Sequence, residues 1–229
     1  MGSMTHAAGR AAFSTALDVT LKNLNKKPEG EIVKLIDLMQ KYMDGEKIDI
    51  DYDKAKQMVL DQDGTLNKYI HRLLDEVDPY VLKMTALNLG YEAFFHGTKT
   101  IRKMREVQKC NIPWLILMDP TSACNLHCTG CWAAEYGNKL NLTCDEIDSI
   151  ICQGKELGIY MYIYTGGEPL VRKKDLIRLC EKHSDCVFLC FTNGTLIDEA
   201  FADEMLRVGN FVPAISLEGF EEATDFRRG

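Results

Sequence analysis

The first part of the chain carries apolar residues at the spacing of amphipathic helices. Between Pro28 and Met43 they recur at three- and four-residue steps, which places them along one stripe of a helix. A second helix is expected from Leu66 to Val77, and Asp78-Pro79 has the character of an N-cap followed by a first helical residue. The pattern therefore predicts an all-α region over residues 1–109.

Beyond residue 109 the pattern changes to short apolar runs that alternate with helical segments. Four runs have the length of strands and are nearly continuous in apolar residues: Ile112 to Met118, Ile159 to Tyr164, Cys186 to Phe191, and Phe211 to Leu217. Such runs are typical of parallel strands that are buried on both faces of a sheet. The helical patterns between them cover residues 143–157, 173–183 and 197–208. This alternation predicts βαβ units with right-handed crossovers, so residues 110–229 are expected to form an α/β domain.

Composition narrows the range of functions. The chain has 229 residues, of which 46% are hydrophobic and 27% are charged, as is ordinary for a soluble globular protein. A net charge of −7 argues against nucleic acid as the main partner, because phosphate binding favours a basic surface. No apolar run is long enough to cross a membrane, and the N-terminus lacks the apolar core of a signal peptide. We therefore expect a cytoplasmic protein with reduced cysteines.

Three cysteines lie close together just after the first predicted strand. Cys124, Cys128 and Cys131 form a C-x-x-x-C-x-x-C motif, whose thiolates could reach one cuboidal iron–sulfur cluster and leave one iron open. A zinc site formed by these cysteines with His127 is the main alternative, although no second C-x-x-C pair follows. We expect His127 to face solvent instead. The other cysteines are expected to pack in the core: Cys110, Cys144, Cys152, Cys180, Cys186 and Cys190.

Further polar segments follow the later strands. After the second strand comes Gly166-Gly167-Glu168, in which paired glycines allow close approach by a ligand and the carboxylate suits a cationic amine. Thr192 to Thr195 follows the third strand, and Ser216 to Gly219 follows the fourth, with Asp225 to Arg228 soon after. The ends of parallel strands are where α/β folds place their sites, so these segments are expected to meet the cysteine loop.

From Pro113 onward the chain resembles the radical S-adenosylmethionine (SAM) superfamily, in particular its peptide- and protein-modifying SPASM-type members. The resemblance implies a (β/α)6 barrel, of which about four strands are present here, so we expect the chain to be truncated at its C-terminus. It also implies that Cys124, Cys128 and Cys131 hold a [4Fe–4S] cluster. The contacts to SAM that it implies come from Gly166, Gly167, Glu168, Asn193, Ser216, Glu218 and Arg228.

The resemblance further implies the reaction. An electron from an external donor of the flavodoxin or ferredoxin type would cleave SAM and give a 5′-deoxyadenosyl radical. This radical would abstract hydrogen from an unidentified substrate, for which a peptide or protein is the leading candidate, and the first step needs no catalytic acid or base. Two alternatives stay open: a non-catalytic iron–sulfur module for electron transfer, and a zinc-stabilised interaction domain. Gly130 departs from the aromatic residue that the family commonly has there, and Trp132 either replaces it or simply packs.

Overall fold

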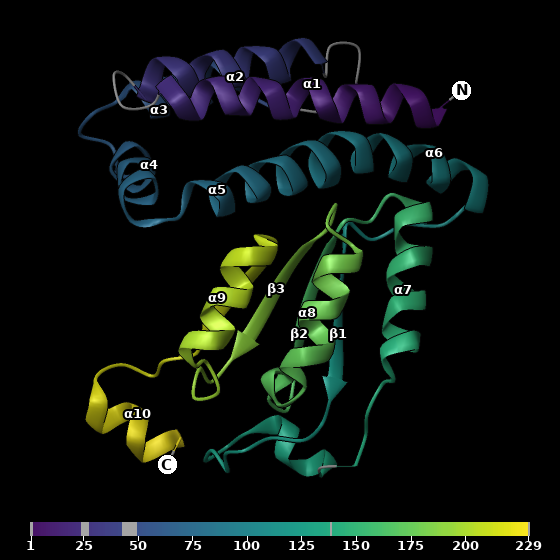
Figure 1. Cartoon of the computed structure of the whole chain (residues 1–229), viewed down its shortest axis with the longest axis vertical. Helices are drawn as coiled ribbons and strands as arrows, with labels where there is room; N and C mark the ends of the chain where they lie inside the picture. Colours follow the sequence, from purple (N-terminus) through teal and green to yellow (C-terminus); the bar gives the residue numbers. More distant parts are fainter. Residues whose placement is uncertain (1, 24–27, 43–49, 138, 229) are drawn as a thin grey trace. The chain divides into compact units, whose positions relative to one another are not determined.

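The computed structural model describes residues 2–23, 28–42, 50–137 and 139–228 (Figure 1). The chain divides into two compact units, Met1–Leu87 and Asn88–Gly229. The domain boundary predicted between residues 109 and 110 lies within the second unit, and it stays a prediction. No described helix combines the length and the apolar character needed to cross a bilayer.

The described part of the first unit is helical, as its pattern predicted. The predicted helix from Pro28 is α2, which ends at Tyr42. The carboxylate of Asp78 accepts hydrogen bonds from the backbone N–H groups of Tyr80 and Val81, so it caps α5 as expected. The helices of this unit are α1 (Gly2–Asn23), α2 (Pro28–Tyr42), α3 (Tyr52–Leu60), α4 (Thr65–Glu76) and α5 (Pro79–Thr85).

A π-helical stretch that the sequence did not predict, η1 (Ala86–Gly97), begins at the last residues of the first unit along the chain and continues into α6 (Thr98–Gln108). The side-chain amide of Asn88 donates hydrogen bonds to the carbonyls of Ser184, at 2.9 Å, and Cys186, at 3.0 Å. These two carbonyls lie just before the third strand of the sheet. The stretch is therefore attached to the N-terminal side of that strand, away from the strand ends that carry the predicted site.

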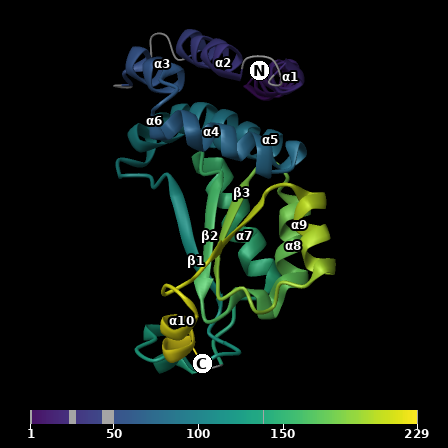
Figure 2. The same cartoon turned by 90° about the vertical axis from the view of Figure 1, so that its left-hand side faces the viewer.

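A four-stranded parallel sheet forms the centre of this unit, with strand order β1-β2-β3-β4. The strands are β1 (Leu115–Thr121), β2 (Met161–Gly166), β3 (Val187–Thr192) and β4 (Phe211–Ile215). The helices α7 (Cys144–Leu157), α8 (Lys173–Lys182) and α9 (Glu199–Val208) follow β1, β2 and β3 and lie on one face of the sheet (Figures 1 and 2). The predicted α/β architecture with four parallel strands is confirmed.

The expectation that the strands are buried on both faces is wrong. On the helix side the sheet is buried at Tyr162, Tyr164 and Phe188. On the opposite side Leu117 is 55% exposed and Phe191 is 45% exposed. A run of apolar residues is expected both in a strand covered on two faces and in a strand with one exposed apolar face. The sequence pattern therefore could not show that one face of this sheet is open.

The cysteines outside the motif divide into two groups. Cys180, Cys186 and Cys190 are buried, as core packing requires, and Cys144 is half-buried. Core packing is wrong for Cys110, which follows α6, and for Cys152 on α7, because both side chains are exposed. The residue type of a cysteine does not show whether its side chain faces the core or the solvent, so the sequence could not identify these two as exposed.

Candidate functional site

The predicted site residues gather around one cavity at the C-terminal ends of the strands. It has a volume of about 180 Å³. Nine of the ten predicted site residues line it: Cys124, Cys128, Cys131, Gly166, Gly167, Glu168, Asn193, Ser216 and Arg228. The tenth, Glu218, is hydrogen-bonded to Arg228. We call this space the cysteine cavity.

Hydrogen bonds to the ends of β1 and β2 hold the loop that carries the cysteines. The backbone N–H of Glu168 donates to the carbonyl of Ala123 at 2.8 Å, and that of Gly167 donates to the carbonyl of Thr121 at 3.0 Å. Within the loop, the N–H of Leu126 contacts the sulfur of Cys124 at 3.4 Å. The start of the loop is therefore fixed to the glycine segment, so the first thiol has a defined position beside it.

The paired glycines are required for this close packing. A Cβ atom added at Gly167 would lie 2.2 Å from the carbonyl oxygen of Ala123, and one at Gly166 would lie 2.6 Å from that of Thr121. Gly166 also has a φ of +109°, which L side chains rarely adopt. The close approach that the sequence predicted for a ligand is thus made by the chain's own cysteine loop.

Replacing Gly167 with alanine should displace this loop. The added methyl group meets backbone rather than a movable side chain, so we expect the free energy of unfolding to fall by about 1–3 kcal/mol. Urea denaturation measures this change. The control is Gly30→Ala within α2, where an added Cβ has no neighbour within 4 Å and helix propensity should raise stability slightly. A Gly167→Ala variant as stable as the unchanged chain would contradict the packing described here.

Glu168 connects the ends of β2 and β3. Its side chain is buried, with an exposed fraction of 1% for the residue. One carboxylate oxygen accepts from the N–H of Leu170, at 2.9 Å, and the hydroxyl of Thr192, at 2.7 Å. The other oxygen accepts from the N–H of Asn193 at 2.8 Å. Three of about four acceptor positions are filled, so one remains open on the second oxygen.

Asn193 lies in a side-chain network that the sequence did not predict. Its amide nitrogen donates to the side-chain oxygen of Asn125 at 3.0 Å, and its own oxygen accepts from the N–H of Thr195 at 2.9 Å. The amide of Asn125 in turn donates to the hydroxyl of Thr195 at 2.8 Å. The network joins the cysteine loop to the loop after β3. Asn125 directly follows Cys124 in the sequence, and this position is the one sequence feature that could have indicated its part in the network.

A short helix at the end of the chain, α10 (Glu221–Arg228), closes another side of the cavity. The carbonyl of Arg227 accepts from the N–H of Thr129 in the cysteine loop at 2.8 Å. Glu218 accepts from the guanidinium groups of Arg228, at 2.6 Å, and Arg227, at 2.5 Å. These two hydrogen bonds, that of Arg228 foremost, lower the pKa of the Glu218 carboxyl. The Nε atom of Arg228 is buried and has no hydrogen-bond partner among the described residues.

A second group of potential metal ligands lies outside the cysteine loop. Among the described residues, the group of three potential ligands with donor atoms within 4.8 Å of one another is Asp148, Cys152 and His183, away from the cysteine loop. There Asp148 already accepts from Lys182 and from His183. His127 is exposed, which confirms the prediction that it faces solvent.

Comparisons with known proteins give partial matches to several enzymes. The Fe-coproporphyrin III synthase of Methanosarcina barkeri is 34% identical over 123 residues, which are 50% of this chain and 30% of that protein. The PqqA peptide cyclase of Bradyrhizobium diazoefficiens is 30% identical over 115 residues, which are 48% of this chain and 30% of that protein. The crystal structure of Streptococcus suis SuiB bound to S-adenosylmethionine has a TM-score of 0.48 at 19% identity, and the match covers 77% of this chain and 40% of that one.

The chain spans about a third of the length of the curated relatives that it matches. A match to the family model of the Radical SAM superfamily covers residues 118–229. This segment contains the cysteine loop, the glycine–glycine–glutamate segment and every other residue that was predicted for the site. Residues 118–229 of this chain therefore belong to the radical SAM superfamily.

Proposed function

We propose that this chain provides the cluster- and SAM-binding part of a radical SAM enzyme. Cys124, Cys128 and Cys131 would hold a [4Fe–4S] cluster, and SAM would occupy the cysteine cavity. The observation that carries the proposal is that three free thiols share one cavity with the buried carboxylate of Glu168 and with Arg228, whose Nε atom is buried without a hydrogen-bond partner among the described residues. A simple electron-transfer module has no use for the latter two groups.

The polar residues that line the cavity suit the methionine end of SAM. The open acceptor position of Glu168 would receive the ammonium group, and Gly166 and Gly167 would hold the carboxylate of Glu168 beside the cysteine loop. The unpartnered Nε–H of Arg228 would donate to the SAM carboxylate, since a buried donor without an acceptor is costly. Asn193 and Ser216 would contact the ribose from the ends of β3 and β4, and Glu218 would orient Arg228.

When bound, the cluster would supply the electron that reductively cleaves SAM, so that hydrogen can then be taken from an unreactive C–H bond. The chain's own residues would bind and orient SAM and exclude water from it. No described acid or base is required for this role. An external flavodoxin or ferredoxin type of donor would supply the electron in the cytoplasm. For the substrate we retain a peptide or protein, which is consistent with the relative named as a peptide cyclase.

Anaerobic reconstitution with iron and sulfide tests the proposal. We expect a brown protein with about four iron and four sulfide per chain, which releases 5′-deoxyadenosine from SAM after reduction with dithionite. Absorption spectroscopy, iron analysis and mass spectrometry of the products measure these outcomes. A cluster that never cleaves SAM would favour the electron-transfer module. A colourless protein that keeps one zinc ion per chain would instead favour the interaction domain.

Arg228→Lys should weaken SAM binding by roughly tenfold or more, because a charged hydrogen bond of about 1.5–3 kcal/mol is lost. Lysine keeps a positive charge for Glu218 but offers no planar donor at the position of Nε. Isothermal titration of SAM into the reconstituted chain measures the dissociation constant. The control is Arg207→Lys on α9, where the arginine pairs with Glu181 and Glu204 instead. Equal affinity in the two variants would rule out the assigned role of Arg228.

A further inference from the structure

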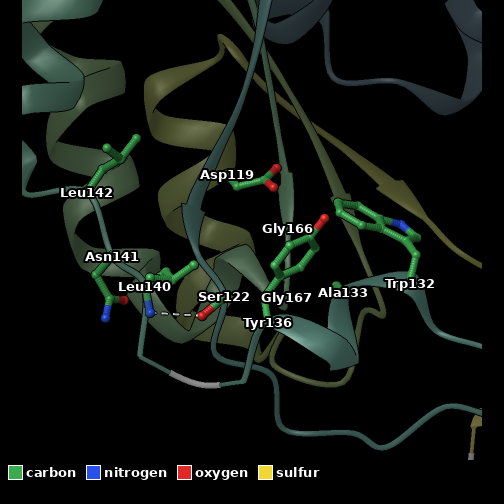
Figure 3. A pocket seen from close by; sticks show the side chains of 10 residues that line it. All are labelled: Asp119, Ser122, Trp132, Ala133, Tyr136, Leu140, Asn141, Leu142, Gly166 and Gly167. Carbon is green, nitrogen blue, oxygen red and sulfur yellow. Dashed lines mark hydrogen bonds between the residues drawn. The ribbon is translucent and has the colours of Figure 1, made fainter.

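A second cavity adjoins the cysteine cavity on the other side of the paired glycines. It has a volume of about 400 Å³ and shares Trp132, Gly166 and Gly167 with the cysteine cavity. Its remaining walls include Asp119 of β1, Tyr136 at the end of η2 (Trp132–Tyr136), and Leu140 (Figure 3). We call this space the side pocket.

Asp119 places a carboxylate in the side pocket without a counter-charge. It lies on the open face of the sheet, like Leu117 two residues earlier, and it is accessible from the pocket. No hydrogen bond or ion pair to a described residue engages it. The residue is exposed, and partial desolvation still raises the pKa of its carboxyl. A carboxylate in such a position would be stabilised by a cation that enters the pocket.

Two aromatic rings form a corner beside this carboxylate. The ring centroids of Trp132 and Tyr136 lie 5.9 Å apart with an interplanar angle of 79°, and each residue is 58% exposed. In Figure 3 the carboxylate of Asp119 and the ring of Tyr136 point into the same space, next to the indole of Trp132. Aromatic faces attract cations, most strongly those of tryptophan. None of the described residues that line the pocket is basic, so no side chain of the wall fills this role.

We propose that the side pocket binds an organic cation, the ammonium or guanidinium group of a substrate, between the carboxylate of Asp119 and the rings of Trp132 and Tyr136. A neutral ligand of the same size would bury the carboxylate without a partner, which is unfavourable. The inference rests on the proposed function, because a substrate must lie beside SAM and the two cavities share one wall. It narrows the substrate to molecules with a positively charged group.

Isothermal titration on the cluster-free chain tests this proposal. The probes are Nα-acetyl-lysine N-methylamide, the matching arginine amide, and the norleucine amide as the uncharged analogue of lysine. We expect saturable binding of the charged amides, with the norleucine amide at least about tenfold weaker. Butylamine distinguishes the source of the cation: equal affinity indicates a small free amine, and weaker binding than the lysine amide indicates a peptide side chain. Equal binding of the lysine and norleucine amides would overturn the proposal.

Asp119→Asn should weaken binding of the lysine amide at least tenfold, and Trp132→Ala and Tyr136→Ala should weaken it as well. The matched control is Asp203→Asn on α9. Asp203 is also an exposed aspartate, but it lines neither the side pocket nor the cysteine cavity. Unchanged affinity in Asp119→Asn, with the fold intact by circular dichroism, would contradict the role of the carboxylate. Competition between SAM and the lysine amide would also contradict the proposal, because the side pocket would then be part of the SAM site.

The failure of this proposal can be separated from that of the proposed function. Cation binding is measured without cluster or SAM, whereas cleavage of SAM is measured on the reconstituted chain. Binding without cleavage would leave the side pocket in place and contradict the proposed enzyme. Cleavage of SAM that is unchanged in Asp119→Asn, together with lost cation binding, is the result that supports both.

Discussion

Replacing Cys128 with alanine should remove essentially all cluster iron and all cleavage of SAM. The three loop thiols are the cluster ligands in the proposal, and they share one cavity from which no described cysteine outside the loop can replace the lost thiolate. Iron analysis after anaerobic reconstitution and the yield of 5′-deoxyadenosine measure the two effects. The fold itself should persist, because Cys128 is half-buried at the surface of a loop and does not belong to the core.

Cys152→Ala is the matched control, because it removes a thiol of the same chemistry from an exposed position on α7. This variant should keep its iron and its activity. If both variants lose iron to the same extent, the assignment of ligands is wrong. If Cys152→Ala alone loses iron, the metal is bound by the group of Asp148, Cys152 and His183 instead. If neither variant loses iron, the metal is bound at neither place.

The strands and helices of the second unit could be predicted because their signals are local. Thr143 and Glu146 form a capping box at the start of α7, and Asp198 caps α9, so both helices begin close to where the pattern places them. Strand β1 instead begins at Leu115 and runs past Pro120 to Thr121. Proline is tolerated there because β1 lies at an edge of the described sheet, where its missing N–H leaves no bond unmade. The apolar pattern alone therefore could not predict that β1 ends at Thr121.

The residues that form the site could largely be predicted from the sequence, whereas the contacts that hold them in place could not. Every predicted site residue lies at the cysteine cavity or contacts a residue that does, because the ends of parallel strands meet at one edge. The bond network of Asn125 and the docking of α10 on Thr129 are long-range contacts, and no spacing in the sequence encodes them. Asp119 directly follows the predicted first strand, and only its position on the open face of β1 in the structure reveals the side pocket.

Glu168→Gln should cause the second large loss, in both stability and SAM binding. Both oxygens of Glu168 accept from donors, so the amide nitrogen of glutamine must face either the N–H of Asn193 or that of Leu170. A buried donor left without its acceptor costs about 1–3 kcal/mol. The negative charge that would bind the ammonium group of SAM is lost as well. We therefore expect a lower melting temperature for the cluster-free chain and almost no 5′-deoxyadenosine from the reconstituted one.

Thr192→Val separates the two effects. It removes a donor to the same carboxylate and an acceptor for the N–H of Gly194 but leaves the negative charge in place, so it should lower stability by about 1–3 kcal/mol. Its SAM affinity should stay within a few-fold of the unchanged chain, whereas that of Glu168→Gln should fall far below it. Calorimetry of unfolding and titration with SAM measure both quantities on each variant. Equal losses of affinity would mean that Glu168 serves only to connect β2 with β3. Unchanged affinity in Glu168→Gln would remove the carboxylate from the SAM site, because the charge on which the ammonium contact depends would then have no measurable effect.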